Sequence, residues 1–114
     1  MNKFRSIKRL TMLSILLATS ASATYNANIS GTITSLKAYA ETDVILIQLS
    51  TQPSTHPTCN PLYFAVGSDL TVERRARLFA MLVATQKNGE TVSLGYDNAA
   101  NCADGYIRVH AVGW

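Results

Sequence analysis

The stretch that decides the fold is residues 68–96, which read SDLTVERRARLFAMLVATQKNGETVSLGY. Apolar residues recur in its first part at helical spacing, namely Val72, Ala76, Phe79, Ala80 and Val83. Ser68 and Asp69 are residue types that cap helix N-termini, and Gly89 is the type that ends helices in the left-handed conformation. Residues 91–96 then alternate with period two. The stretch predicts a capped helix that leads directly into a strand.

The predicted helix is more apolar than a single buried stripe requires. Leu78, Met81 and Leu82 extend its apolar surface, whereas packing on one small core needs a stripe only about 100° wide. Either a small domain buries the helix deeply, or one side packs on the chain's own sheet and the other contacts a neighbouring subunit. The second interpretation assigns Leu78, Met81 and Leu82 to an oligomer interface.

The first 23 residues have the features of an export signal. Four basic residues lie within the first nine, an apolar run follows at 10–18, and small residues end the segment at Ala23. The apolar run is too short to span a bilayer. We therefore predict a signal peptide at residues 1–23 and one mature domain at residues 24–114. The mature protein is expected to be secreted, in the periplasm or outside the cell, and not to span a membrane.

Export changes the charge that bears on function. The full chain has ten Lys and Arg against seven Asp and Glu, but four of the basic residues lie in the leader. The mature domain is thus close to neutral, so the basic balance of the full chain predicts no nucleic-acid partner.

Cys59 and Cys102 are the only two cysteines. In an exported chain they are expected to form a disulfide that closes a loop of about 40 residues. Free or metal-binding thiols are the alternative, although the chain has no Cys-x-x-Cys motif and its two histidines, His56 and His110, lack ligand spacing. No metal or cofactor is expected.

Four further segments read as strands, at residues 29–40, 44–49, 62–66 and 106–112. With the strand at 91–96 the order is strand, strand, strand, helix, strand, strand. This order predicts a mainly β domain with one helix, built as a five-stranded Greek-key barrel of the OB type. An open sheet with one helix across it is the alternative.

Chemistry-bearing motifs are scarce. No nucleophile is paired with a base and no glycine-rich phosphate loop occurs, so the chain is not expected to be an enzyme. Arg74, Arg75 and Arg77 form the one dense cluster of charge, which is either a solvated helix face or a contact for an anion or a partner. Trp114 either packs on the barrel or offers a stacking surface for a sugar.

These features resemble the B subunits of the subtilase cytotoxin and typhoid toxin group. The likeness rests on the order of elements in a small secreted domain, on residues 88–96, which read NGETVSLGY, and on residues 29–31, which read ISG. In that family a helix, a glycine, a valine-containing strand and a terminal tyrosine follow one another. The chain departs from the family at residues 28–29, where the family has aromatic residues, and at Cys102, since the family pairs the cysteine matching Cys59 elsewhere.

The resemblance implies an OB barrel, a ring of five copies beneath an enzymatic A subunit, and a glycan site for terminal sialic acid. Two positions of that site match Ser30 and Tyr96. A serine hydroxyl can bind the sialate carboxylate, and a tyrosine can pack on the sugar and donate a hydrogen bond. We therefore expect a homopentameric subunit that binds host cell-surface glycans. The alternative is a monomeric exported OB domain that binds a protein, as an inhibitor or envelope factor.

Overall fold

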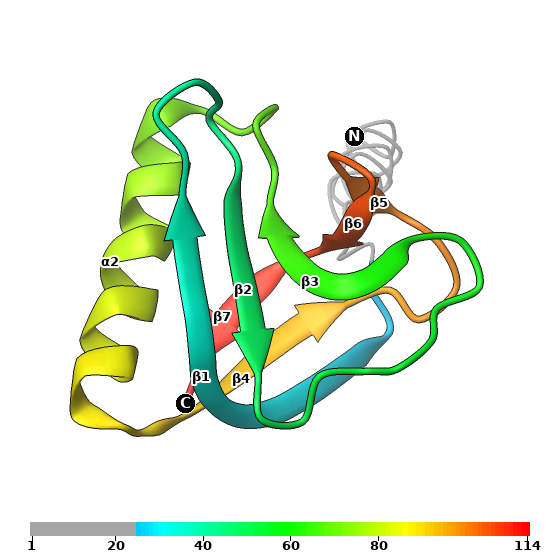
Figure 1. Ribbon diagram of the computed structural model, residues 1–114, viewed down its shortest axis with the longest axis horizontal. Helices are drawn as coiled ribbons and strands as arrows, with labels where there is room; N and C mark the ends of the chain where they lie inside the picture. Colours follow the sequence, from blue (N-terminus) through cyan, green and yellow to red (C-terminus); the bar gives the residue numbers. More distant parts are fainter. Residues whose placement is uncertain (1–24) are drawn as a thin grey trace, which may run out of the picture.

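One helix and seven strands make up residues 25–114, the part of the chain that the computed structural model describes (Figure 1). The predicted signal peptide, residues 1–23, lies outside this part. The elements in chain order are β1 Ala27–Ala38, β2 Ile45–Leu49, β3 Asn60–Val66, α2 Val72–Asn88, β4 Thr91–Tyr96, β5 Cys102–Ala103, β6 Tyr106–Arg108 and β7 Ala111–Gly113. The domain is mainly β with one helix, as the sequence predicts.

All seven strands belong to one curled sheet, in the order β5-β6-β3-β2-β1-β4-β7. The curl comes from β1, which pairs with β4 up to Thr32 and with β2 from Ile33 onward (Figure 1). Gly31 lies just before this change of partner, where a Cβ would stand 2.5 Å from Oγ1 of Thr51. Glycine therefore lets the loop after β2 pack closely against the bend.

The predicted final strand at residues 106–112 is wrong in one respect, because the structure divides it into β6 and β7. β6 runs parallel to β3, whereas β7 is antiparallel to β4. Between them the backbone N–H of Val109 donates to Ala65 and that of His110 donates to Gly95. The chain thus crosses from the β3 edge to the β4 edge here. With β5 added, the half-barrel has seven strands rather than the predicted five.

The ends of α2 follow local chemistry. Gly89 is the predicted left-handed C-terminal cap, with φ of 65°. The N-cap is Thr71, whose hydroxyl accepts from the N–H of Arg74, so the prediction of Ser68 or Asp69 as the cap is wrong. Ser68 instead binds the carboxylate of Asp104, and Asp69 forms an ion pair with Arg108.

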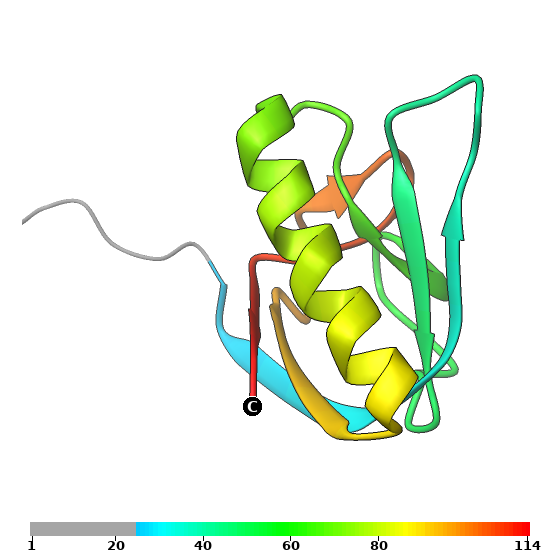
Figure 2. The same cartoon turned by 90° about the vertical axis from the view of Figure 1, so that its left-hand side faces the viewer.

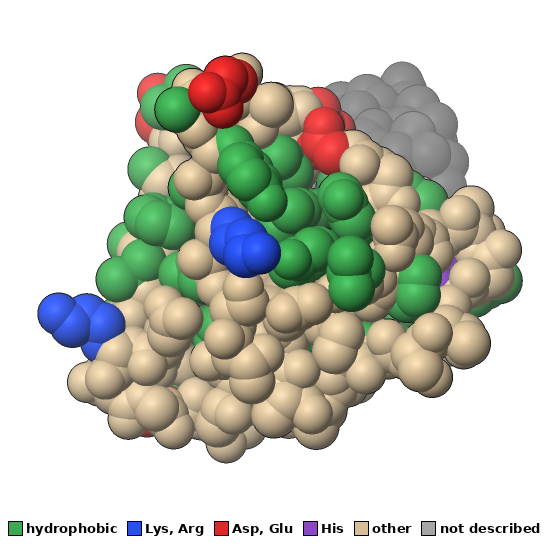
Figure 3. Space-filling model, viewed as in Figure 1, with side chains coloured by type: hydrophobic (Ala, Val, Ile, Leu, Met, Phe, Trp, Pro, Cys, Tyr) green, Lys and Arg blue, Asp and Glu red, His purple; other side chains and the backbone are tan. Residues whose placement is uncertain are grey.

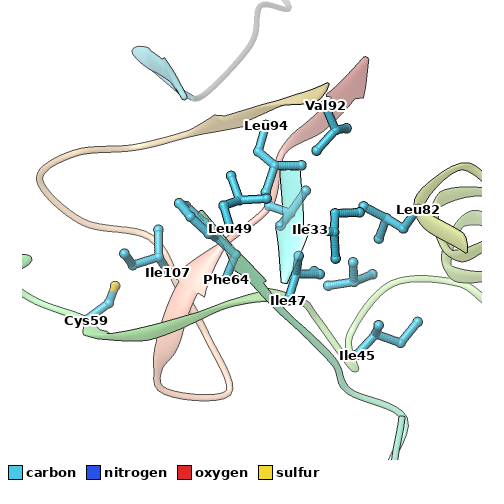
Figure 4. Close-up of a cluster of buried hydrophobic side chains, with 12 residues drawn as sticks. Ile33, Ile45, Ile47, Leu49, Cys59, Phe64, Leu82, Val92, Leu94 and Ile107 are labelled. Carbon is cyan, nitrogen blue, oxygen red and sulfur yellow. The ribbon is translucent and has the colours of Figure 1, made fainter. Parts of the chain in front are cut away.

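The core lies between the concave face of the sheet and α2 (Figures 2 and 4). Its largest fully buried apolar side chains are Phe64, Ile47, Leu82, Leu94, Ile107, Val66 and Val92. Leu82 points from α2 into this cluster (Figure 4), so it is not available to a neighbouring subunit, and that part of the expected interface is corrected. Leu78 is half-buried against the same core, and Met81 is half-buried as well.

The predicted disulfide is confirmed. Cys59 and Cys102 are bonded, with their Cα atoms 5.5 Å apart, and no cysteine is free. The bond joins the residue before β3 to β5 at the edge of the sheet. Within residues 25–114, no helix has the length and apolarity needed to cross a membrane.

Candidate functional site

The two residues predicted to bind a glycan do not meet. In an antiparallel pair, directly opposed residues share a face, and Ser30 opposes Ser93 on β4. Tyr96 lies three positions further along β4, so its side chain points to the other face. Its ring packs edge-on against the fully buried Phe64 at a centroid distance of 5.5 Å. Ser30 is exposed and Tyr96 is half-buried in the core, so the two residues cannot form one small site.

A different set of side chains gathers on the convex face of the sheet. Lys37 of β1, Tyr39 just after it, Tyr63 of β3 and Tyr106 of β6 form what we call the tyrosine surface. Figure 3 shows hydrophobic side chains over β2 and β3 on this face, with a basic side chain among them. Three strands that are far apart in sequence are needed to build the surface.

Lys37 orders the tyrosine surface. Its Nζ donates to Oη of Tyr63 at 2.9 Å and lies 5.3 Å from the centroid of the same ring. This hydrogen bond is the main reason that the pKa of Lys37 is raised above its usual value, and the phenol groups of Tyr63 and Tyr39 add to it. The ring of Tyr106 stands nearly perpendicular to that of Tyr63, with centroids 5.7 Å apart.

A small apolar cluster lies beneath the tyrosine surface, and Tyr63 and Tyr106 pack against it. Leu46, Ala65 and Ala103 are buried there as a small apolar cluster, separate from the main core. Two of the three are alanines, so the sheet leaves room for Tyr63 and Tyr106 to pack against it. The rings are therefore anchored on one side while part of each stays accessible to solvent.

This arrangement has the chemistry of a sugar-binding surface. An aromatic ring offers an apolar face to the C–H groups of a pyranose, and its hydroxyl exchanges hydrogen bonds at the rim. Lys37 adds a cation with three donors, fixed in place by Tyr63. A side chain held before binding loses less conformational entropy when a ligand arrives.

A second concave feature carries less chemistry. A groove of about 450 Å³ runs between the loop after β2 and the start of β3, lined in part by Gln48, Gln52 and Leu62. However, the amide of Gln48 donates to the carbonyl of Leu62, and that of Gln52 donates to Pro61. Gln48 thus links β2 to β3, and Gln52 holds the loop after β2 against β3, so the polar side chains of the groove are used to stabilise the fold.

His56 also has a structural role. Its Nδ1 accepts from the backbone N–H groups of Thr58 and Cys59, so the proton lies on Nε2, which donates to the carbonyl of Asp97 at 2.9 Å. These hydrogen bonds join residues 56–59 to Asp97, next to the disulfide of Cys59. Residues 25–114 contain no group of three or more His, Cys, Asp or Glu arranged to hold a metal ion.

His110 lies between β6 and β7, where the chain crosses the sheet. It is half-buried and stacks on Tyr25, with ring centroids 5.7 Å apart. Burial is the main cause that lowers its pKa, the charge of Arg108 lowers it further, and Asp97 opposes them.

The tyrosine surface was missed from sequence, although a signal existed. Successive strand residues face opposite sides of a sheet, so Tyr63 lies on the face opposite Phe64 and Tyr106 on the face opposite Ile107, two core residues. A tyrosine directly beside a core residue on each of two strands is the signal that the sequence offers. That the two strands pair, however, follows only from the topology.

Comparison of this chain with protein-family models, with curated proteins and with solved structures finds no match.

Proposed function

We propose that the chain is an exported, non-enzymatic glycan-binding domain of the OB type, of the kind that serves as the B subunit of a bacterial toxin. The observation that carries the proposal is the pair of ordered rings, Tyr63 and Tyr106, with Lys37 bonded to one of them. The disulfide supports residence in an oxidising compartment. The tyrosine surface replaces Ser30 and Tyr96 as the proposed glycan site.

Binding at the tyrosine surface would use stacking for affinity and polar groups for orientation. A sugar ring would lie on the accessible part of Tyr63 or Tyr106, with its hydroxyls toward the phenol oxygens. The ammonium of Lys37 would favour a glycan that carries a carboxylate, such as a sialylated one.

Assembly as a homopentamer that carries an A subunit is part of the same proposal. With Leu82 in the core and Leu78 and Met81 half-buried, a more exposed apolar flank of α2 is formed by Val72, Ala76 and Ala80. Val72 keeps 67% of its surface accessible in the single chain. An apolar helix flank of this kind favours burial against a neighbouring chain.

The test is a glycan array probed with the oxidised mature protein, followed by titration of any glycan that binds. Tyr63→Ala and Tyr106→Ala should each weaken binding about tenfold, the loss expected when a stacking ring is removed. Ser30→Ala is the matched control on the same sheet and should bind as the wild type does. Loss of binding in Ser30→Ala with retention in both tyrosine variants would reject the tyrosine surface.

A monomeric exported domain that binds a protein is the second candidate. The exposed side chains of Leu62 and Trp114 favour it, since large apolar groups at the surface often mark a protein contact. Light scattering separates the two candidates: a mass near five chains supports the ring, and a monomer that binds no glycan supports the protein-binding domain.

A further inference from the structure

A pocket of about 290 Å³ lies on the opposite flank of α2 from Val72, beside the crossing between β6 and β7. Leu78 and Val109 contribute apolar walls. Four basic side chains also line it, namely Arg74, Arg77, Arg108 and His110. Its volume is close to the lower end of the range for small-molecule sites, roughly 300 Å³.

Two of the arginines present their charge to the pocket without a counter-charge. Arg74 and Arg77 are three residues apart on α2, so they lie on the same side of the helix. Among residues 25–114, the ion pairs join Arg75 to Asp43 and Arg108 to Asp69, and neither Arg74 nor Arg77 takes part in one.

The third arginine is fixed rather than free. Arg108 donates from Nη1 to Asp69 at 2.9 Å and from Nη2 to the carbonyl of Cys102 at 3.1 Å. These two bonds hold the guanidinium at the wall of the pocket and still leave N–H donors unused, because arginine has five. The Asp69 carboxylate offsets the charge of Arg108, so the excess positive charge of the pocket comes from Arg74 and Arg77.

We propose that this pocket binds the oxyanion of a small organic ligand, a carboxylate or a sulfate or phosphate ester, between Arg74 and Arg77. Guanidinium groups match such anions because they donate two parallel hydrogen bonds to them. The carbon skeleton of the ligand would lie against Leu78 and Val109. This site needs no glycan at the tyrosine surface, and it gives the arginine cluster a role that a solvated helix face does not.

The experiment titrates the oxidised protein with four ligands on one scaffold and follows backbone amide chemical shifts. The ligands are glucuronate, glucose 6-sulfate, glucose 6-phosphate and the neutral methyl glucoside. The anions should bind with shifts centred on Val109 and His110, and the neutral sugar should not. Preference among the three anions would identify which oxyanion group the pocket takes.

Two variants make the result specific. The double variant Arg74→Gln/Arg77→Gln keeps good helix formers at two exposed positions. It should weaken the affinity for the anion by about three- to thirtyfold, the range for the loss of two solvent-exposed charge contacts. Lys87→Gln removes a cation from the last turn of the same helix, away from the pocket, and should leave the affinity within about twofold. Equal weakening in Lys87→Gln would overturn the site, because it would mean diffuse attraction. Equal binding of methyl glucoside, or no binding of any anion, would overturn it too.

Discussion

Removal of the disulfide should cost this domain a large share of its stability. The bond closes a loop of 43 residues, and the entropy that such a closure removes from the unfolded chain is worth about 4 kcal/mol. A domain of this size has a total free energy of unfolding of about 5–13 kcal/mol. The variant should therefore melt about 15–30 °C lower than the wild type.

The structure indicates that the folded state itself would change little. The loops on either side of the bond are also held by Thr58, whose hydroxyl donates to the carbonyl of Ala99 at 2.6 Å, and by the bond from His56 to Asp97. Cys59 is 4% exposed, so alanine is the right replacement there, because serine would bury a hydroxyl. Cys59→Ala with Cys102→Ser thus isolates the effect on the unfolded chain.

Urea unfolding followed by far-ultraviolet circular dichroism measures this loss directly. The variant should show a lower midpoint and also a steeper dependence on urea, because an unfolded chain without the cross-link exposes more surface. A loss below about 1 kcal/mol would refute the loop-entropy reasoning. A loss far above about 4 kcal/mol with an altered spectrum would show that the bond shapes the folded state.

Three further outcomes follow from the packing and the electrostatics. Leu82→Ala should lower the free energy of unfolding by about 2–5 kcal/mol, whereas Val72→Ser should change it by less than about 0.5 kcal/mol in the monomer; urea unfolding of both variants would contradict the core assignment if the losses were equal. Thr71→Ala should cost about 1 kcal/mol by removing the cap of α2, and Thr71→Ser, which keeps the hydroxyl, should retain most of it. Burial lowers the pKa of His110 in the folded state, so below the ordinary value of 6.5 the unfolded chain binds the proton first and stability falls as the pH falls toward the folded pKa. Melting curves at several pH values should show this loss of stability in the wild type and a smaller loss in His110→Gln. If the two losses were equal, a group other than His110 would cause the pH dependence.

The helix and the strand after it are predictable from sequence because their signals are local. Apolar spacing and Gly89 each act within a few residues, and the structure places α2 and β4 where these signals indicate. The N-cap was misplaced because Ser68, Asp69 and Thr71 are all capping types. The contacts of Asp104 and Arg108 with the first two, which leave Thr71 as the cap, come from residues more than thirty positions away.

The end of the chain could not be predicted for the same reason. Residues 106–112 alternate as one strand would, and nothing local marks the crossing at Val109 and His110. Their backbone N–H groups find acceptors on β3 and on β4, two strands from separate parts of the sequence. The expected glycan site also depended on strand register. Because Ser30 of β1 pairs with Ser93 of β4, Ser30 and Tyr96 lie on opposite faces of the sheet.

The divided pairing of β1 has a consequence for when the protein can fold. The later half of β1 pairs with β2, which follows it after a short turn. The earlier half of β1 pairs with β4, and Tyr96 of β4 comes roughly 70 residues after its partner Ala27. β7, the last strand, then adds to β4. A chain that is still being made can therefore pair β1 with β2 and β2 with β3, but the earlier half of β1 stays unpaired until β4 is available. The sheet is therefore complete only once β4 and β7, near the C-terminal end of the domain, are in place.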